Sequence, residues 1–163
     1  MSSNPVWTNL FRNKIDWIKD ATELCAKNPL FSGISPHTVR WMVSRMHPRD
    51  YEKGETIFDM GKPGVGAVLL LSGEVSIIAS KVELARLVRG DLFGEVALVT
   101  DLPRTAKAVA TEDCRIVFFL RSDLREWMEH RPKQASHLLV NLAEMMAQRL
   151  MEANRQLTVK GAG

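Results

Sequence analysis

The chain has 163 residues, 45% of them hydrophobic and 25% charged, which suits one domain whose core needs no metal or disulfide. The formal net charge of +3 and the scattered basic residues give no nucleic-acid footprint, and the longest apolar run, 65–71, is too short to span a bilayer. Charges throughout the first thirty residues exclude a signal peptide, so we expect a cytoplasmic protein with reduced core cysteines, Cys25 and Cys114.

Residues 1–48 are predicted to form an N-terminal helical segment. Asn28-Pro29 should end a first helix, and Ser35 followed by Pro36 is typical of the start of a second. Apolar residues at three- and four-residue steps give the first helix one buried stripe, made of Trp7, Leu10, Phe11, Ile18, Ala21 and Cys25.

Residues 49–121 change to short apolar or alternating runs separated by glycine-containing turns. Six or more strands at this spacing, without intervening helices, indicate an antiparallel sandwich or barrel rather than a parallel sheet. The expected strands are 55–60, 66–71, 74–79, 82–88, 107–111 and 115–120.

Residues 122–157 return to a helical pattern, with a short helix before Pro132 and a longer one after it, and 158–163 are expected to be a frayed tail. The long helix carries one apolar stripe. Two interpretations stay open for the stripe: packing on the barrel, or homodimerisation, because a helix of about 25 residues outruns the barrel beneath it.

The segment 90–106, called the cassette below, carries the chemistry. Gly94 lets the backbone turn sharply and a ligand approach it closely. The run from Glu95 to Val99 can make one helical turn, whose free N–H groups favour an anion. Pro103 ends that turn before Arg104, a permanent cation whose forked donors suit a phosphodiester. A salt bridge between Glu95 and Arg104 is the structural alternative.

Phe93-Gly94-Glu95-Val96-Ala97-Leu98, followed by Pro103-Arg104-Thr105-Ala106, resembles the phosphate-binding cassette of cyclic nucleotide-binding domains. These domains occur in kinase regulatory subunits, gated channels and catabolite-activator-type regulators. The resemblance runs from about Leu24 to Leu150 and implies an eight-stranded antiparallel β-roll (jelly-roll-like) with N-terminal helices and a long C-terminal helix. The stretch 64–71 departs from the family by lacking its acidic and aromatic residues.

The resemblance also implies roles for particular residues. Glu95 would accept a hydrogen bond from the ribose 2′-hydroxyl, and Arg104 would pair with the phosphate. Phe93 and Gly94 open the cassette, and the remaining donors would be backbone N–H groups around Val96, Ala97 and Thr105 or Ala106.

The base of the nucleotide would meet a different set of residues. By position in the strand before the cassette, Ala85 and Leu87 would line its pocket. The long helix would fold over it as a lid, with Met145 and Arg149 as capping residues. Thr105 is compatible with either base, so cAMP is only slightly favoured over cGMP.

The function expected is a cyclic nucleotide sensor without catalysis, cofactor or metal, acting on an unidentified effector. The four histidines lack metal-binding spacing, and no nucleophile motif or Walker loop is present. No DNA-binding, kinase or channel segment follows the last helix, so the chain is a free-standing module or a piece of a larger protein. The alternatives are a fragment of a catabolite-activator-type transcription regulator and an interaction module that has lost the ligand.

Overall fold

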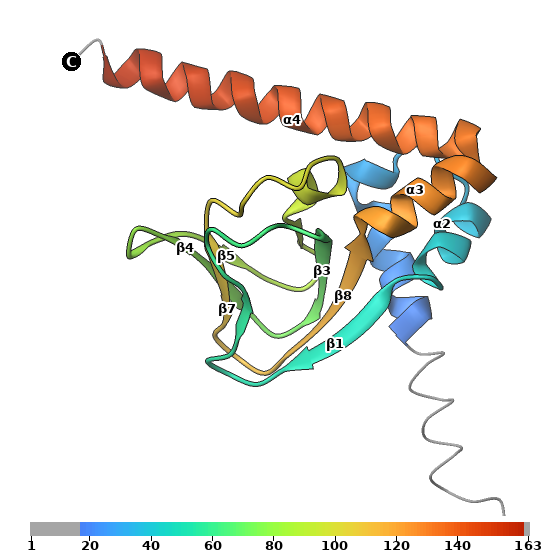
Figure 1. The fold of residues 1–163 in the computed structure, drawn as a ribbon, viewed down its shortest axis with the longest axis horizontal. Helices are drawn as coiled ribbons and strands as arrows, with labels where there is room; N and C mark the ends of the chain where they lie inside the picture. Colours follow the sequence, from blue (N-terminus) through green and yellow to red (C-terminus); the bar gives the residue numbers. More distant parts are fainter. Residues whose placement is uncertain (1–16, 162–163) are drawn as a thin grey trace, which may run out of the picture.

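The computed structural model describes residues 17–161, and this part of the chain contains two four-stranded antiparallel sheets flanked by helices (Figure 1). One sheet has the strand order β1-β8-β3-β6 and the other β2-β7-β4-β5. The predicted β-roll with N-terminal helices and a long C-terminal helix is confirmed. The strands are β1 (His47–Tyr51), β2 (Thr56–Phe58), β3 (Gly66–Ser72), β4 (Val75–Ala79), β5 (Val82–Leu87), β6 (Leu92–Phe93), β7 (Lys107–Ala110) and β8 (Cys114–Leu120).

The first helix ends, and the second begins, where the capping residues predict. A helix over residues 17–27 stops at Asn28, whose side chain accepts a hydrogen bond from Leu30 N (3.0 Å) and caps the 3-10 helix η1 (Pro29–Phe31). Ser35 Oγ accepts from Thr38 N at 3.2 Å at the start of α2 (Pro36–Val43). The predicted apolar positions Trp7, Leu10 and Phe11 lie outside the described residues.

Two strands, β1 and β6, are absent from the predicted set. The sequence of β1, His-Pro-Arg-Asp-Tyr, has no apolar alternation because the strand lies at the edge of its sheet and pairs only with β8. It also starts the β region at His47, two residues before the predicted boundary. Strand β6 has two residues, too few for a periodic signal.

Strand β3 is buried on both faces, which explains its unbroken apolar sequence. Ala67, Leu69 and Leu71 pack in a cluster with the helices, whereas Val68 and Leu70 pack in a second cluster inside the roll. A strand with two buried faces needs apolar residues at every position rather than at alternate ones. Strand β3 is therefore the wall between the helical layer and the interior of the roll.

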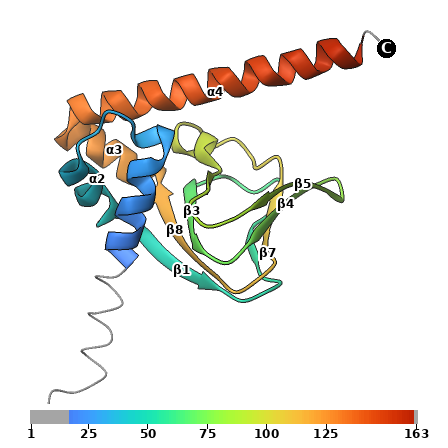
Figure 2. The ribbon, with the colours of Figure 1, turned by 180° about the vertical axis from the view of Figure 1, so that it is seen from behind.

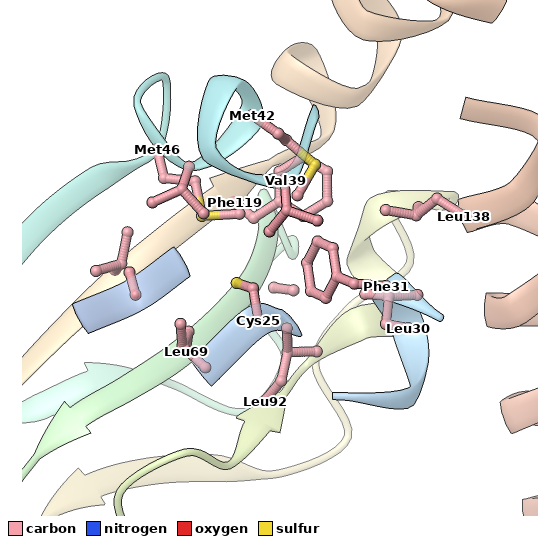
Figure 3. Packing of buried hydrophobic residues seen from close by; sticks show 14 of the residues in the cluster. Cys25, Leu30, Phe31, Val39, Met42, Met46, Leu69, Leu92, Phe119 and Leu138 are labelled. Atoms are coloured by element: carbon pink, nitrogen blue, oxygen red, sulfur yellow. The ribbon is translucent and has the colours of Figure 1, made fainter. Parts of the chain in front are cut away.

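The helical cluster surrounds Phe31, which lies among the side chains of Cys25, Val39 and Leu138 (Figure 3). Burial raises the pKa of the Cys25 thiol to about 12, because the low-polarity surroundings disfavour a thiolate. Cys114 is also buried and free, and burial raises its pKa as well. Both cysteines are thus core thiols, as the sequence predicts.

Helices α3 (Arg121–His130) and α4 (Pro132–Lys160) complete the fold, and α4 passes over the roll so that its C-terminal end projects past the strands (Figure 2). Ala135 and Leu138 in the first half of α4 are buried, whereas Leu150 and Leu157 in the second half are 63% and 69% exposed. The core-packing interpretation therefore holds for the first half of the stripe. Residues 158–160, predicted to be frayed, continue the helix.

Candidate functional site

A cavity of about 390 Å³ opens between the cassette, the second sheet and α4. Such a volume is in the range of small-ligand pockets. Strands β2, β4 and β5 each supply one apolar wall residue, and α4 supplies a single charged one. The lining residues are Phe58, Ile77, Leu84, Phe93, Gly94, Glu95, Val96, Ala97, Leu102, Pro103, Arg104, Thr105, Ala106 and Arg149.

The cassette turn is a short 3-10 helix, η2 (Glu95–Leu98), which confirms the predicted helical turn. Gly94 precedes it with φ +68°, a left-handed conformation that disfavours other residues. A Cβ added at Gly94 would also lie 2.5 Å from Arg104 Nη1. Glycine is thus required here both for the backbone conformation and for the closeness of the arginine.

Arg104 is held firmly in the wall of the cavity. Its Nη1 donates to Gly94 O at 3.0 Å, its Nη2 donates to Gly66 O at 2.7 Å, and its guanidinium lies 4.1 Å from the ring centroid of Phe58. Its Nε is buried and donates no hydrogen bond. Burial lowers the pKa of Arg104, but an arginine keeps its charge at any physiological pH. The arrangement presents a fixed, desolvated cation to the cavity.

Glu95 is the buried carboxylate of the site, with its side chain 2% exposed. Its Oε1 lies against Nη1 of Arg149 on α4 as an ion pair and accepts no hydrogen bond of ordinary geometry. Arg149 itself is 59% exposed. The predicted salt-bridge alternative between Glu95 and Arg104 is wrong, because each of these two side chains has other partners.

Nine of the twelve predicted site residues line this one cavity. Arg149, more than forty residues after the end of the cassette, reaches the cavity from α4. The nine are Phe93, Gly94, Glu95, Val96, Ala97, Arg104, Thr105, Ala106 and Arg149.

Three predicted residues do not line the cavity. Met145 packs as a partly buried residue against the helical cluster, one helical turn before Arg149. Neither Ala85 nor Leu87 is among the lining residues, and Leu87 packs against the interior cluster instead. The pairing register shifts between Ile77 and Ile78, which leaves Leu84 as an extra residue. Leu84 therefore lies in the wall of the cavity, whereas regular alternation along the strand predicts its neighbour Ala85 there.

Sequence reasoning missed Phe58, Ile77 and Leu84 as wall residues. Phe58 and Ile77 sit in strands that the sequence does predict, but the pairing of those strands decides which side chains face the cassette. An aromatic residue under a buried arginine is a signal that could have identified Phe58.

A wider groove of about 560 Å³ lies at the ends of β1 and β8, but four of its five charged residues, all except Glu52, bond within the protein. Arg115 Nε donates to Asp50 Oδ1 at 2.7 Å, and Asp113 Oδ1 accepts from Lys53 N at 2.9 Å. The groove at β1 and β8 contains no buried charge directed at a ligand. The cavity beside the cassette is therefore the candidate site.

Within residues 17–161, no group of three or more histidine, cysteine or acidic side chains is arranged to hold a metal ion. None of the helices in that range is both long and apolar enough to cross a membrane.

Comparison with known proteins matches residues 48–131 to the cyclic nucleotide-binding domain. The cyclic AMP receptor protein of Thermus thermophilus is 35% identical over 135 residues, 80% of this chain and 61% of that protein. A CRP-like cAMP-activated global transcriptional regulator of Mycobacterium tuberculosis is 29% identical over 140 residues, 83% of this chain and 61% of that protein. The solved Thermus thermophilus catabolite activator protein has a TM-score of 0.73 at 34% identity, covering 81% of this chain and 62% of that one.

This chain thus spans about 61% of the length of these two sequence relatives. The matched residues include the whole of the cassette and of the roll from β2 to β8. The chain belongs to the cyclic nucleotide-binding domain family.

Proposed function

We propose that this chain binds a cyclic nucleotide monophosphate, cAMP somewhat better than cGMP, and acts as a sensor without catalysis. The observation that carries the proposal is the placement of a buried carboxylate, Glu95, and a fixed guanidinium, Arg104, in the wall of one cavity. A cyclic nucleotide offers each a partner, a ribose hydroxyl that donates and a singly charged phosphate that accepts. The preference for cAMP rests on the relatives named for it.

In this proposal the phosphate meets Arg104 and the N–H groups at the start of η2, while the apolar wall of Ile77 and Leu84 receives the base. The free Nε of Arg104 supplies a further donor on a group that is already positioned. Because the Arg104 side chain is already ordered before the ligand binds, binding costs less side-chain entropy.

Helix α4 is proposed as the moving part. Arg149 on α4 pairs with Glu95, the same carboxylate that would accept the ribose hydroxyl. The ligand therefore shares or displaces this contact, and α4 shifts to the extent that one helix position binds the ligand more tightly than the other. An effector that reads the position of α4 would carry the signal.

Calorimetric titration tests the binding proposal. We expect saturable binding of cAMP, weaker binding of cGMP, and a loss of about 10- to 150-fold for 2′-deoxy-cAMP, because the hydroxyl bonded to a charged group is removed. AMP is the matched ligand control, since its opened phosphate has a different shape and charge. Absence of heat with either cyclic nucleotide at millimolar concentration would overturn the proposal, and chromatography of the same samples tests for turnover.

We further propose that the chain forms a homodimer through the second half of α4. Apolar residues of α4 from Leu139 to Leu157 recur at alternating steps of four and three, the spacing of a coiled-coil seam, and the seam extends into the second half of the helix. This seam begins at Leu139, within the core-facing stripe of Ala135, Leu138 and Leu142, and its mean direction lies about 70° around the helix from that stripe. The seam consists of Leu139, Ala143, Met146, Leu150, Ala153 and Leu157. Leu139 and Met146 also pack, partly buried, against the helical cluster, so the exposed end of the seam is Leu150, Ala153 and Leu157.

Sedimentation velocity tests the dimer. The wild type is expected to be a dimer, and Leu150→Glu with Leu157→Glu is expected to make it a monomer, because two charges per helix would be buried in the seam. Met151→Glu with Val159→Glu is the matched control, since both residues are 71% exposed and lie off the seam. The proposal fails if the wild type is a monomer or if the two double variants behave alike.

The sensor part of a transcription regulator is a second candidate. It is favoured by the relatives, which extend beyond the aligned part and one of which is named a transcriptional regulator. In such a protein the pairing of two α4 helices would fix the distance between the two copies of the segment that follows α4.

A further inference from the structure

Arg121, the first residue of α3, connects that helix to the cassette. Its Nη1 donates to the carbonyl oxygens of Gly64 at 3.0 Å, Ala97 at 3.0 Å and Thr100 at 2.5 Å. Its backbone N also donates to Val65 O at 2.8 Å. One side chain thus holds the loop before β3 and the cassette turn together at the start of a helix.

The position of this guanidinium suits the direction of the cassette turn. Ala97 and Thr100 lie at the C-terminal side of η2, where carbonyl groups lack partners within the helix. A cation at that end stabilises the helix dipole. The opposite end of the same turn begins at Gly94 and faces the cavity. Arg121 therefore stabilises the turn from the side away from the ligand.

Gly64 extends the connection to the phosphate arginine. A Cβ added at Gly64 would lie 2.6 Å from Ala97 Cβ and 3.2 Å from Arg104 Cζ. Arg104 in turn donates to Gly66 O at 2.7 Å. The loop segment 64–66 is therefore held by Arg121 on one side and by Arg104 on the other, so the hydrogen bonds of both guanidinium groups depend on where this segment lies.

Helix α3 packs against both β1 and α4. Asp123 in its first turn accepts from Leu120 N at 2.9 Å and lies 3.2 Å from His47 Nε2, which ties α3 to the edge strand β1. Trp127 of α3 and Leu138 of α4 are buried in the same cluster, and one residue separates the two helices. The two helices thus form one packed unit.

We propose that Arg121 is a positioning residue for the phosphate-binding turn, and that it couples the geometry of this turn to α3 and so to α4. The proposal rests on the proposed cyclic nucleotide binding. It assigns to Arg121 no contact with the ligand. Its effect passes through the three carbonyl groups and the loop segment that Arg104 shares.

The test compares Arg121→Gln with Arg125→Gln, since Arg125 is an exposed arginine one turn further along α3. Hydrogen–deuterium exchange of the ligand-free proteins is measured first. Faster exchange in residues 96–101 is expected for Arg121→Gln alone. This result does not depend on a ligand, so it separates the failure of this proposal from that of the proposed function.

Titration with cAMP follows on the same proteins. Arg121→Gln is expected to bind about 10- to 100-fold more weakly, the scale of lost charge-assisted hydrogen bonds. At saturating cAMP the protection of residues 145–157 in α4 should be smaller than in the wild type, which a merely structural role would not produce. Arg121→Lys, which keeps the charge without the fork, should recover part of the affinity and serves also if the glutamine variant does not fold.

The proposal is overturned if the Arg121 variants match Arg125→Gln in cassette exchange and in cAMP affinity. It is also overturned if they lower only the urea midpoint, with cassette exchange and α4 protection unchanged. If the wild type itself binds no cAMP, the proposed function fails, and unchanged exchange at 96–101 would reject the positioning of the turn separately.

Discussion

Arg104→Leu is expected to weaken cAMP binding by about 10- to 150-fold, because it removes a charge-assisted hydrogen bond of about 1.5–3 kcal/mol. Leucine keeps an apolar side chain beside Phe58 but supplies neither charge nor donors. Calorimetric titration gives the affinity, and urea unfolding gives the stability of the same sample.

The two measurements are both needed because Arg104 also supports the fold. It bonds the carbonyl groups of Gly66 and Gly94, and leaving these buried acceptors without partners costs about 1–3 kcal/mol of stability. Arg104→Lys should be intermediate in affinity, since the ammonium keeps the charge but cannot bond both carbonyls and a phosphate in one plane.

Arg86→Leu is the matched control for Arg104→Leu. Arg86 lies on β5 outside the cavity, more than half exposed, and pairs with Glu74 and Glu83. Exposed pairs contribute little, so both affinity and stability should change by less than about 1 kcal/mol. Equal affinities for Arg104→Leu and the control would reject the phosphate role of Arg104.

The parts of the fold that the sequence predicts well are those determined by neighbouring residues. Ser35 and Pro36 define the start of α2, and β3 is marked by one unbroken apolar run. The cassette belongs to the same class, because Gly94, Glu95 and Arg104 are ten residues apart at most and their turn is local. These features can be predicted from one sequence because the residues that form them are close together in the chain.

Features that depend on pairing between distant strands could not be predicted in the same way. The irregular register between β4 and β5 moves Leu84 into the cavity wall in place of the expected Ala85. No residue pattern in β5 predicts this irregularity. Likewise, Met145 and Arg149 share a face of α4, and where the helix lies along the roll decides that Arg149 meets Glu95 while Met145 packs against the core. Arg121 gave no sequence signal, because its partners are backbone carbonyls that any residue carries.

Gly66→Ala is expected to lower the free energy of unfolding by about 3 kcal/mol, the upper part of the range for overpacking, because the added methyl meets only main chain. A Cβ at Gly66 would lie 2.1 Å from Phe119 O and 2.7 Å from Leu120 Cα, so β8 must move away from β3. Gly54→Ala is the control: its φ of +92° disfavours alanine by about 1–2 kcal/mol, yet no atom lies within 4 Å of the new methyl.

Urea unfolding followed by circular dichroism separates these two costs, and the steric hypothesis is wrong if Gly66→Ala is as stable as Gly54→Ala. The comparison also bears on binding, because Gly66 O accepts the hydrogen bond that fixes Arg104. When β3 shifts, that acceptor shifts with it, so the folded Gly66→Ala protein should bind cAMP more weakly, whereas Gly54→Ala should bind like the wild type. A loss of stability without a loss of affinity would mean that Arg104 keeps its position without the Gly66 carbonyl.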